Sequence, residues 1–163
     1  PVDFHARFHA TGRSYVYRLS LRKEPFRQHT VASLPRLAGV DREKMRAAAA
    51  LLLDYAAFAP FCKTNSDAFT MNCELTASHW EFGDDEWTFH VSANRFLRGM
   101  VRLIVGMCLR VGEGKLSLEE VRRALDVQER LPRPWSAPAA GLYLSEVRYP
   151  NRAMWEEIGT FSR

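Results

Sequence analysis

One arginine lies in the middle of a segment that is otherwise almost entirely apolar. Arg102 belongs to a run from 96 to 111 that we predict to be a buried helix. A charge in such a setting costs free energy unless an opposite charge and hydrogen bonds compensate it. At about 100° per residue, Arg98 and Arg110 fall in the same arc of the helix. The pattern indicates either an arginine that holds a carboxylate or phosphate in a cleft, or the solvated face of a half-buried helix.

Two tyrosines and two arginines share a segment with the alternation of a half-buried strand. Tyr15 and Tyr17 lie on one face of the predicted strand 14–21, and Arg13 and Arg18 flank them. Aromatic rings on a sheet beside arginines can form a platform on which bases stack. The alternative is a pair of core tyrosines whose hydroxyls reach the rim of the core. Taken alone, the pattern favours the core.

The familiar catalytic and metal-binding patterns are missing from the sequence. His5 and His9 are four residues apart, but no cysteine or acid follows them at ligand spacing. We therefore expect no metal there. We find no nucleophile elbow and no glycine-rich phosphate loop. The cysteines Cys62, Cys73 and Cys108 form no CxxC pair, so we expect reduced, buried thiols.

These residues must be positioned by strands and helices that the apolar periodicity predicts. The predicted order is strand 14–21, a long connection over 22–39, helix 41–54, strand 71–82 with a bulge, strand 87–93, helix 96–111, a helix from 117, and strand 141–149. Ser117 and Glu120 predict a capping box at the start of the last helix. The order predicts a single α+β domain over 1–163, with a mostly antiparallel sheet and helices packed on one face.

Composition and charge exclude several classes of protein. The chain has 163 residues with 47% hydrophobic and 26% charged residues, which excludes disordered and collagen-like chains. No apolar run approaches the roughly 20 residues of a membrane-spanning helix, and no signal peptide is present, so we expect a cytoplasmic protein without a membrane partner. The net charge is +4, and 19 of the 23 cations are arginine. This bias favours RNA contact, although a GC-rich genome also produces it.

Four groups of motifs follow one another between residue 4 and about residue 150. They are Phe4-His5-Ala6-Arg7-Phe8 with Arg13-x-Tyr15-x-Tyr17, Asn94-x-Phe96 with Met100-Val101-Arg102, Gly141-Leu142-Tyr143-Leu144, and Val147-x-Tyr149-Pro150. In sequence and order they resemble the C-terminal half of the TruA family of tRNA pseudouridine synthases. The resemblance implies half of the pseudouridine synthase fold, an α+β fold.

The resemblance also implies a reaction and its residues. The family isomerises uridine to pseudouridine in the anticodon stem-loop of tRNA, at positions 38, 39 and 40, without metal or organic cofactor. By resemblance Tyr15 stacks on the flipped base and Arg102 pairs with the catalytic aspartate. The resemblance thus implies that Tyr15 and Arg102 are the catalytic residues of this chain. Leu142 would pack against the pocket wall. Further substrate-binding residues are Arg7, Arg13 and Arg98. The implied partner is tRNA, and the family forms homodimers.

The nucleophile of the family is the point at which this chain departs from the pattern. That aspartate follows Gly-Arg-Thr, whereas none of the seven aspartates here follows Arg-Thr. Because the chain also begins at Pro1, we expect a C-terminal piece that is inactive alone and whose N-terminal half carries the nucleophile. The alternative is a non-catalytic RNA-binding or dimerisation module on the same scaffold. Gly99 is a smaller departure, at a position where many relatives carry histidine.

Overall fold

The computed structural model describes residues 4–37, 39–63 and 69–150, and its elements follow the predicted order. The strands are β1 (Gly12–Ser20), β2 (Ala32–Ser33), β3 (Leu75–Phe82), β4 (Glu86–Ala93) and β5 (Leu142–Arg148). The α-helices are α1 (Arg42–Leu51), α2 (Met100–Gly112) and α3 (Leu118–Val127), and short 3-10 turns lie at Pro35–Leu37, Leu52–Asp54, Ala59–Phe61 and Ala139–Gly141. The predicted α+β fold is confirmed.

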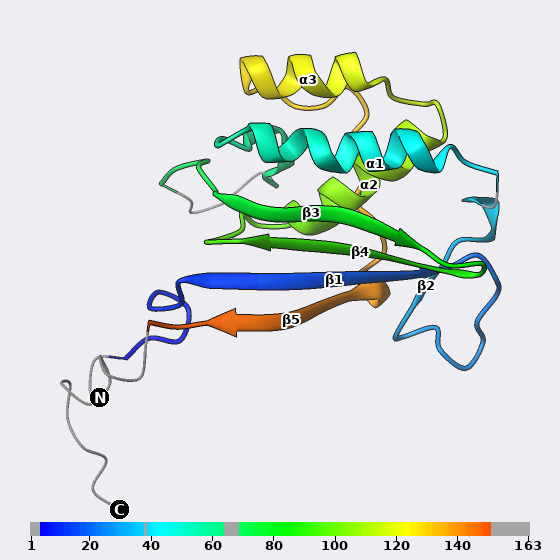
Figure 1. Ribbon diagram of the computed structural model, residues 1–163, viewed down its shortest axis with the longest axis horizontal. Coiled ribbons are helices and arrows are strands. Elements are labelled where there is room, and N and C mark those ends of the chain that lie inside the picture. The colour runs from blue at the N-terminus through cyan, green and yellow to red at the C-terminus, as the bar shows by residue number, and fades with distance from the viewer. Residues whose placement is uncertain (1–3, 38, 64–68, 151–163) are drawn as a thin grey trace, which may run out of the picture.

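Strand β1 is the centre of the sheet. β4 pairs antiparallel with one edge of β1, and β3 pairs antiparallel with β4. Two strands share the other edge of β1: β5 is antiparallel along Gly12–Tyr17, and β2 is parallel at Leu19–Ser20. Figure 1 shows β3, β4, β1 and β5 side by side in that order. Apart from the two-residue β2 pairing, the sheet of the described residues is antiparallel, as predicted.

One face of this sheet forms the core together with the helices. Several of the side chains that alternate along β1 and β4 on this face are fully buried, among them Tyr17, Leu19 and Phe89. Eleven of the 13 residues of α2 are buried with them, because this helix is apolar nearly all round. Helix α1 packs against α2, and α1 and α3 lie on the β3 side of the view in Figure 1. The opposite face of the sheet is half-exposed.

Helix α2 begins later than the sequence predicts. It starts at Met100 rather than at residue 96, because Gly99 adopts a left-handed conformation with φ of 75° at the N-cap. A helix cannot run through a residue with positive φ, so residues 94–99 form a loop instead. A side chain at position 99 would be strained, and its Cβ would lie 2.8 Å from the Lys63 side chain.

Two other local predictions can be compared with the structure. The expected bulge is present as a register shift between Leu75 and Ala77, although β3 begins at Leu75 rather than at 71. The capping box is confirmed: the Ser117 Oγ accepts from the Glu120 N–H at 3.1 Å, and the Glu120 carboxylate accepts from the Ser117 N–H at 2.7 Å. Both ends of this box stabilise the first turn of α3.

Candidate functional site

Tyr15 lies on the helix-covered face of β1, near the edge of the core. Its neighbour in the alternation, Tyr17, is fully buried, whereas Tyr15 is only half-buried. The Tyr15 ring meets Phe96 edge-on, with ring centroids 5.1 Å apart and planes at 90°. Phe96 belongs to the loop that leads into α2, so the late start of this helix places the ring beside β1. The two rings form an aromatic wall, and both residues are only half-buried.

Arg102 is half-buried on α2 and is held by a distant part of the chain. Its Nε donates to the Ala137 carbonyl at 2.6 Å, and the Ala137 N–H donates back to the Arg102 carbonyl at 3.0 Å. These two hydrogen bonds fix the arginine against the segment before β5. Among the residues that the structure describes, no ion pair includes Arg102. The guanidinium therefore keeps donor capacity for an anion.

The charge of Arg102 affects the pKa of Tyr17, the buried tyrosine of β1. Burial raises the pKa of the Tyr17 phenol well above its ordinary value, and the positive charge of Arg102 opposes this rise. The Tyr17 hydroxyl donates to the Pro138 carbonyl at 2.9 Å. Strand β1, helix α2 and the segment 137–138 thus meet at one point, where a cation is surrounded by apolar side chains.

A glycine of α2 makes this meeting possible. Gly106 lies one turn after Arg102, on the same face of the helix. A Cβ at Gly106 would lie 1.8 Å from the Trp135 carbonyl oxygen, far inside van der Waals contact. Only a residue without a side chain lets the segment around Trp135 cross the helix here. This crossing places Ala137 within hydrogen-bond distance of Arg102.

Leu142 and Leu144 line the same face on the neighbouring strand. Leu142 is opposite Tyr17 in the register of β1 and β5, and Leu144 is opposite Tyr15. Leu142 is half-buried against the core, whereas Leu144 is 53% exposed. Leu144 and Phe96 were not among the site residues expected from the sequence. The leucine could have been found from its spacing, because positions i and i+2 of a strand share a face.

The three other arginines expected to bind substrate have different settings. Arg13 donates to the carbonyls of Ala10, at 2.9 Å, and Asn94, at 2.7 Å, and also to the carbonyl of Arg7. It therefore ties the segment before β1 to the end of β4. Arg7 is exposed, with its guanidinium 5.6 Å from the centroid of the Phe8 ring. Arg98 is exposed in the loop before α2. The structure thus brings Tyr15 and Leu142 onto one face of the sheet. Arg102 acts on that face through the effect of its charge on the Tyr17 pKa, and Arg13 lies two residues before Tyr15 on the same strand.

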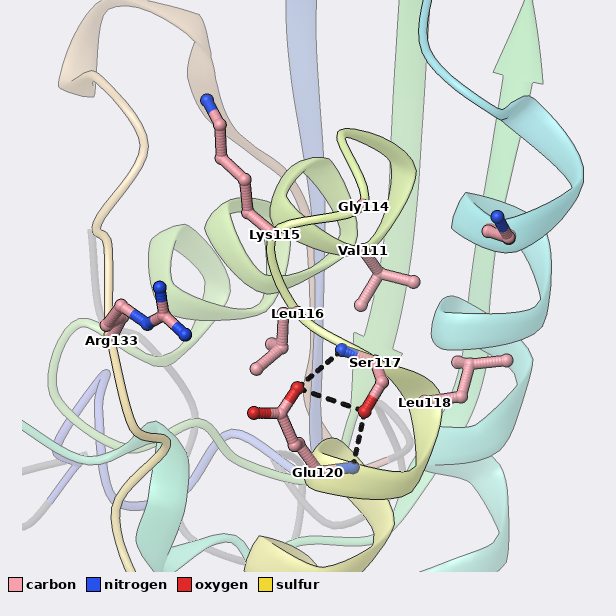
Figure 2. Close-up of a pocket in the computed structure, with 9 residues that line it drawn as sticks. Val111, Gly114, Lys115, Leu116, Ser117, Leu118, Glu120 and Arg133 are labelled. Carbon is pink, nitrogen blue, oxygen red and sulfur yellow. Dashed lines mark hydrogen bonds between the residues drawn. The ribbon is translucent and has the colours of Figure 1, made fainter.

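A separate pocket of about 430 Å³ lies between the first turn of α1, the end of α2 and the start of α3. Its lining includes Lys44, Lys115 and Arg133 but none of the expected site residues. Figure 2 shows that the Glu120 carboxylate occupies the start of α3, where it accepts from Ser117. The first turn of α3 is therefore already supplied with an internal acceptor, which leaves this pocket a weak candidate for anion binding.

The cysteines agree in part with the sequence prediction. All three are free; Cys73 and Cys108 are buried, whereas Cys62 is half-buried. Burial raises the pKa of the Cys108 thiol to about 12 and also raises that of Cys73, so neither supplies a thiolate near neutral pH. Within the described ranges, none of the helices has the length and apolarity needed to cross a membrane.

Comparison with known proteins finds a family model and several curated relatives that match this chain. A family model described as tRNA pseudouridine synthase matches residues 48–150. The chain is 40% identical over 148 residues to tRNA pseudouridine synthase A of Parabacteroides distasonis, covering 91% of this chain and 58% of the relative. It is 42% identical over 152 residues to the protein of that name from Porphyromonas gingivalis, covering 92% and 60%. For Bacteroides thetaiotaomicron the identity is 41% over 160 residues, covering 95% and 58%.

The described residues form an α+β scaffold in which Tyr15 and Phe96 lie together at the edge of the helix-covered face of the sheet. The chain belongs to the tRNA pseudouridine synthase family. It spans about three-fifths of the length of the curated relatives that it matches.

Proposed function

We propose that this chain provides the C-terminal half of a tRNA pseudouridine synthase, which isomerises uridine to pseudouridine in the anticodon stem-loop of tRNA. The partner is tRNA, the working protein is a cytoplasmic homodimer, and the nucleophilic aspartate comes from the part of the protein outside this chain. The proposal rests on family membership and on the three-fifths of the relatives' length that the chain spans. The chain by itself is expected to be inactive.

The reaction exchanges one bond to the sugar for another. The bond between C1′ and N1 of the uracil breaks, the ring turns, and C1′ bonds to C5; the proton leaves C5 and N1 regains one, so atoms balance. In our proposal Tyr15 stacks on the flipped ring and Leu142 packs against it. Arg102 is a positioning residue: its guanidinium keeps the aspartate ionised and aimed at C1′. Arg7, Arg13 and Arg98 bind the RNA backbone.

The structural observation that favours an enzyme over a non-catalytic module is the setting of Arg102. A guanidinium half-buried among apolar side chains costs free energy unless an anion accompanies it, and no described carboxylate does so. A non-catalytic RNA-binding or dimerisation module has no need for such a residue. A pairing aspartate from outside the chain supplies the missing partner and explains why the carbonyl of Ala137 occupies only one side of the guanidinium.

The test uses the complete protein to which this chain belongs and a tRNA transcript carrying tritium at C5 of uridine. Tritium release measures the turnover of C5. We expect Arg102→Ala to lower the rate at least 100-fold, since breaking a buried ion pair costs about 3 kcal/mol or more. Arg102→Lys restores the charge but not the planar fork, so we expect partial recovery. Tyr15→Phe separates stacking from the role of the hydroxyl.

The matched control is Arg46→Ala, which removes an exposed arginine of α1 that pairs with Glu43. We expect it to leave tritium release unchanged. Binding of tRNA, measured by filter retention, should be similar in all variants. If Arg102→Ala retains full tritium release, the role assigned to Arg102 is wrong. If the complete protein binds tRNA but releases no tritium, the alternative of a non-catalytic RNA-binding module replaces the proposed reaction.

A further inference from the structure

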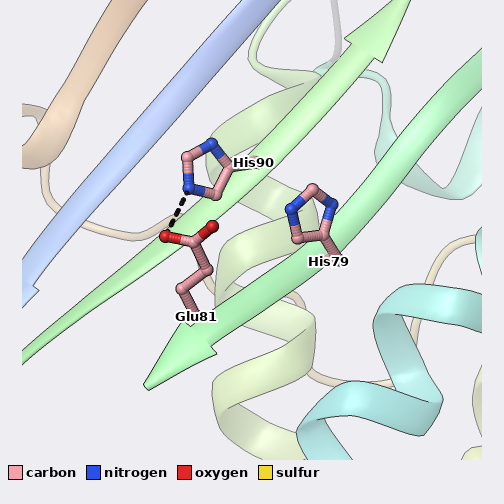
Figure 3. Close-up of side chains that lie close together, drawn as sticks. All are labelled: His79, Glu81 and His90. Atoms are coloured by element: carbon pink, nitrogen blue, oxygen red, sulfur yellow. Dashed lines mark ion pairs between the residues drawn. The ribbon is translucent and has the colours of Figure 1, made fainter. Parts of the chain in front are cut away.

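A second cluster of chemistry-bearing side chains lies on the opposite face of the sheet. His79 and Glu81 come from β3 and His90 from β4, and their ligand atoms all lie within 4.8 Å of one another. Figure 3 shows the three side chains gathered on one face of the β3–β4 hairpin. Tyr15 and Tyr17 point to the helix-covered face, so this cluster is independent of the proposed catalytic site.

The register of the hairpin assembles the cluster. His79 is directly opposite His90, and their rings are stacked with centroids 5.0 Å apart and planes at 11°. Glu81 is two residues after His79, so the pleat of β3 places it on the same face. Its Oε2 lies 3.3 Å from the His90 Nε2. Three side chains from two strands therefore converge without any change of the backbone.

One histidine nitrogen of the cluster is available to bind a metal ion. His90 Nε2 is shielded from solvent, and among the described residues it makes no hydrogen bond of good geometry despite the nearby carboxylate. Such an atom loses its hydrogen bonds to water on folding and gains none from the protein, which costs free energy. A metal ion would satisfy it. The nearby cation on this face of β1 is Arg18. Its guanidinium lies 5.5 Å from the centroid of the Tyr143 ring of β5, on the side of β1 away from β4, and therefore away from the cluster.

We propose that His79, Glu81 and His90 bind a zinc ion that clips β3 to β4. Two imidazoles and one carboxylate form a donor set that zinc accepts, whereas calcium and magnesium prefer oxygen ligands alone. Zinc bonds of about 2.0–2.2 Å place tetrahedral ligand atoms about 3.4 Å apart. The ligand atoms lie at most 4.8 Å apart, so the exposed His79 and Glu81 side chains must bring theirs closer by at most about 1.4 Å, which changes of side-chain torsion provide. The fourth position is open to water.

The test is calorimetric titration of the protein with zinc chloride, with cobalt chloride as an optical reporter for the same site. We expect one equivalent of zinc per chain and visible cobalt bands typical of a four-coordinate ion. His79→Gln and His90→Gln should each weaken zinc binding at least tenfold, and Glu81→Gln should weaken it less. His29→Gln is the matched control, an exposed histidine outside the cluster, and should leave the affinity unchanged.

Two further measurements locate the ion and guard against misfolding. Zinc should slow hydrogen exchange of the β3 and β4 amides, because the ion links the two strands, and circular dichroism checks that each variant is folded. The half-buried Cys62 is the competing thiol, so Cys62→Ser is included. Zinc binding that survives both histidine substitutions, that disappears with Cys62→Ser, or that is undetectable at 100-fold excess of metal would overturn the proposal.

Discussion

The Trp135 segment crosses α2 so closely at Gly106 that we expect Gly106→Ala to have the opposite effect on stability from the one that helix propensity predicts. In an exposed helix, Gly→Ala stabilises by about 1 kcal/mol. At Gly106 the added Cβ would lie 1.8 Å from the Trp135 carbonyl oxygen, so the segment must move by more than 1 Å to restore ordinary contact. That movement pulls Ala137 away from Arg102. We therefore expect Gly106→Ala to destabilise the protein.

The size of the loss follows from the hydrogen bonds that join the segment to α2. The bond from the Arg102 Nε to the Ala137 carbonyl involves a charge and contributes about 2 kcal/mol, and the bond from the Ala137 N–H contributes about 1 kcal/mol. The gain in helix propensity offsets about 1 kcal/mol of this. The net decrease in the free energy of unfolding is about 2 kcal/mol.

Urea unfolding followed by tryptophan fluorescence measures this decrease. With a slope of about 2 kcal/mol per molar urea, the midpoint should fall by about 1 M. Gly39→Ala is the control, because a Cβ there meets nothing within 4 Å; its midpoint should stay within about 0.3 M of the original. A Gly106→Ala protein that is as stable as the original, or more stable, would refute the argument that the close crossing holds Arg102.

Two further predictions concern stability alone. Ser117→Ala removes the capping box of α3 and should lower the free energy of unfolding by about 1 kcal/mol, measured by urea unfolding; an unchanged midpoint would contradict the cap's contribution. At alkaline pH the unfolded chain loses the Cys108 proton near its ordinary pKa of 9.0, whereas burial raises the folded pKa to about 12. The contribution of this thiol to the free energy of unfolding should therefore be constant below about pH 8 and fall between about pH 9 and 12, by at most about 1.4 kcal/mol per pH unit. Urea unfolding of Cys108→Ala over the same range should show a shallower fall, and an equal slope would exclude Cys108 as its source.

The sequence predicts the elements well because they are set by local periodicity. The alternation around Tyr15 and Trp87 and the capping box at Ser117 require only neighbours in the chain. The predicted start of α2 is wrong because Phe96 and Leu97 extend the apolar pattern into the loop, and the left-handed Gly99 gives no signal in hydrophobicity. Sequence reasoning that weighted this glycine as a helix boundary would have found it.

The contacts of the candidate site depend on long-range geometry that periodicity does not contain. The apolar surroundings of Arg102 indicate that it needs a partner, but the partner found in the structure is a carbonyl 35 residues later, in a proline-rich connection without periodicity. The approach of His79 and His90 requires the hairpin register. That register could be obtained by counting outward from the turn at Gly83, but the His-x-Glu spacing on β3 by itself does not indicate a site.

The two neighbours on one edge of β1 have a consequence for synthesis on the ribosome. β1 is translated well before β5, which completes that edge from Gly12 to Tyr17 and is the last of the described strands. At about 5–20 residues per second, the nascent chain waits roughly 6–25 seconds between the two. During that interval one edge of β1 presents unpaired amides and carbonyls, and such an edge can pair with strands of other chains. We expect ribosome-associated chaperones to shield nascent chains that end before residue 142.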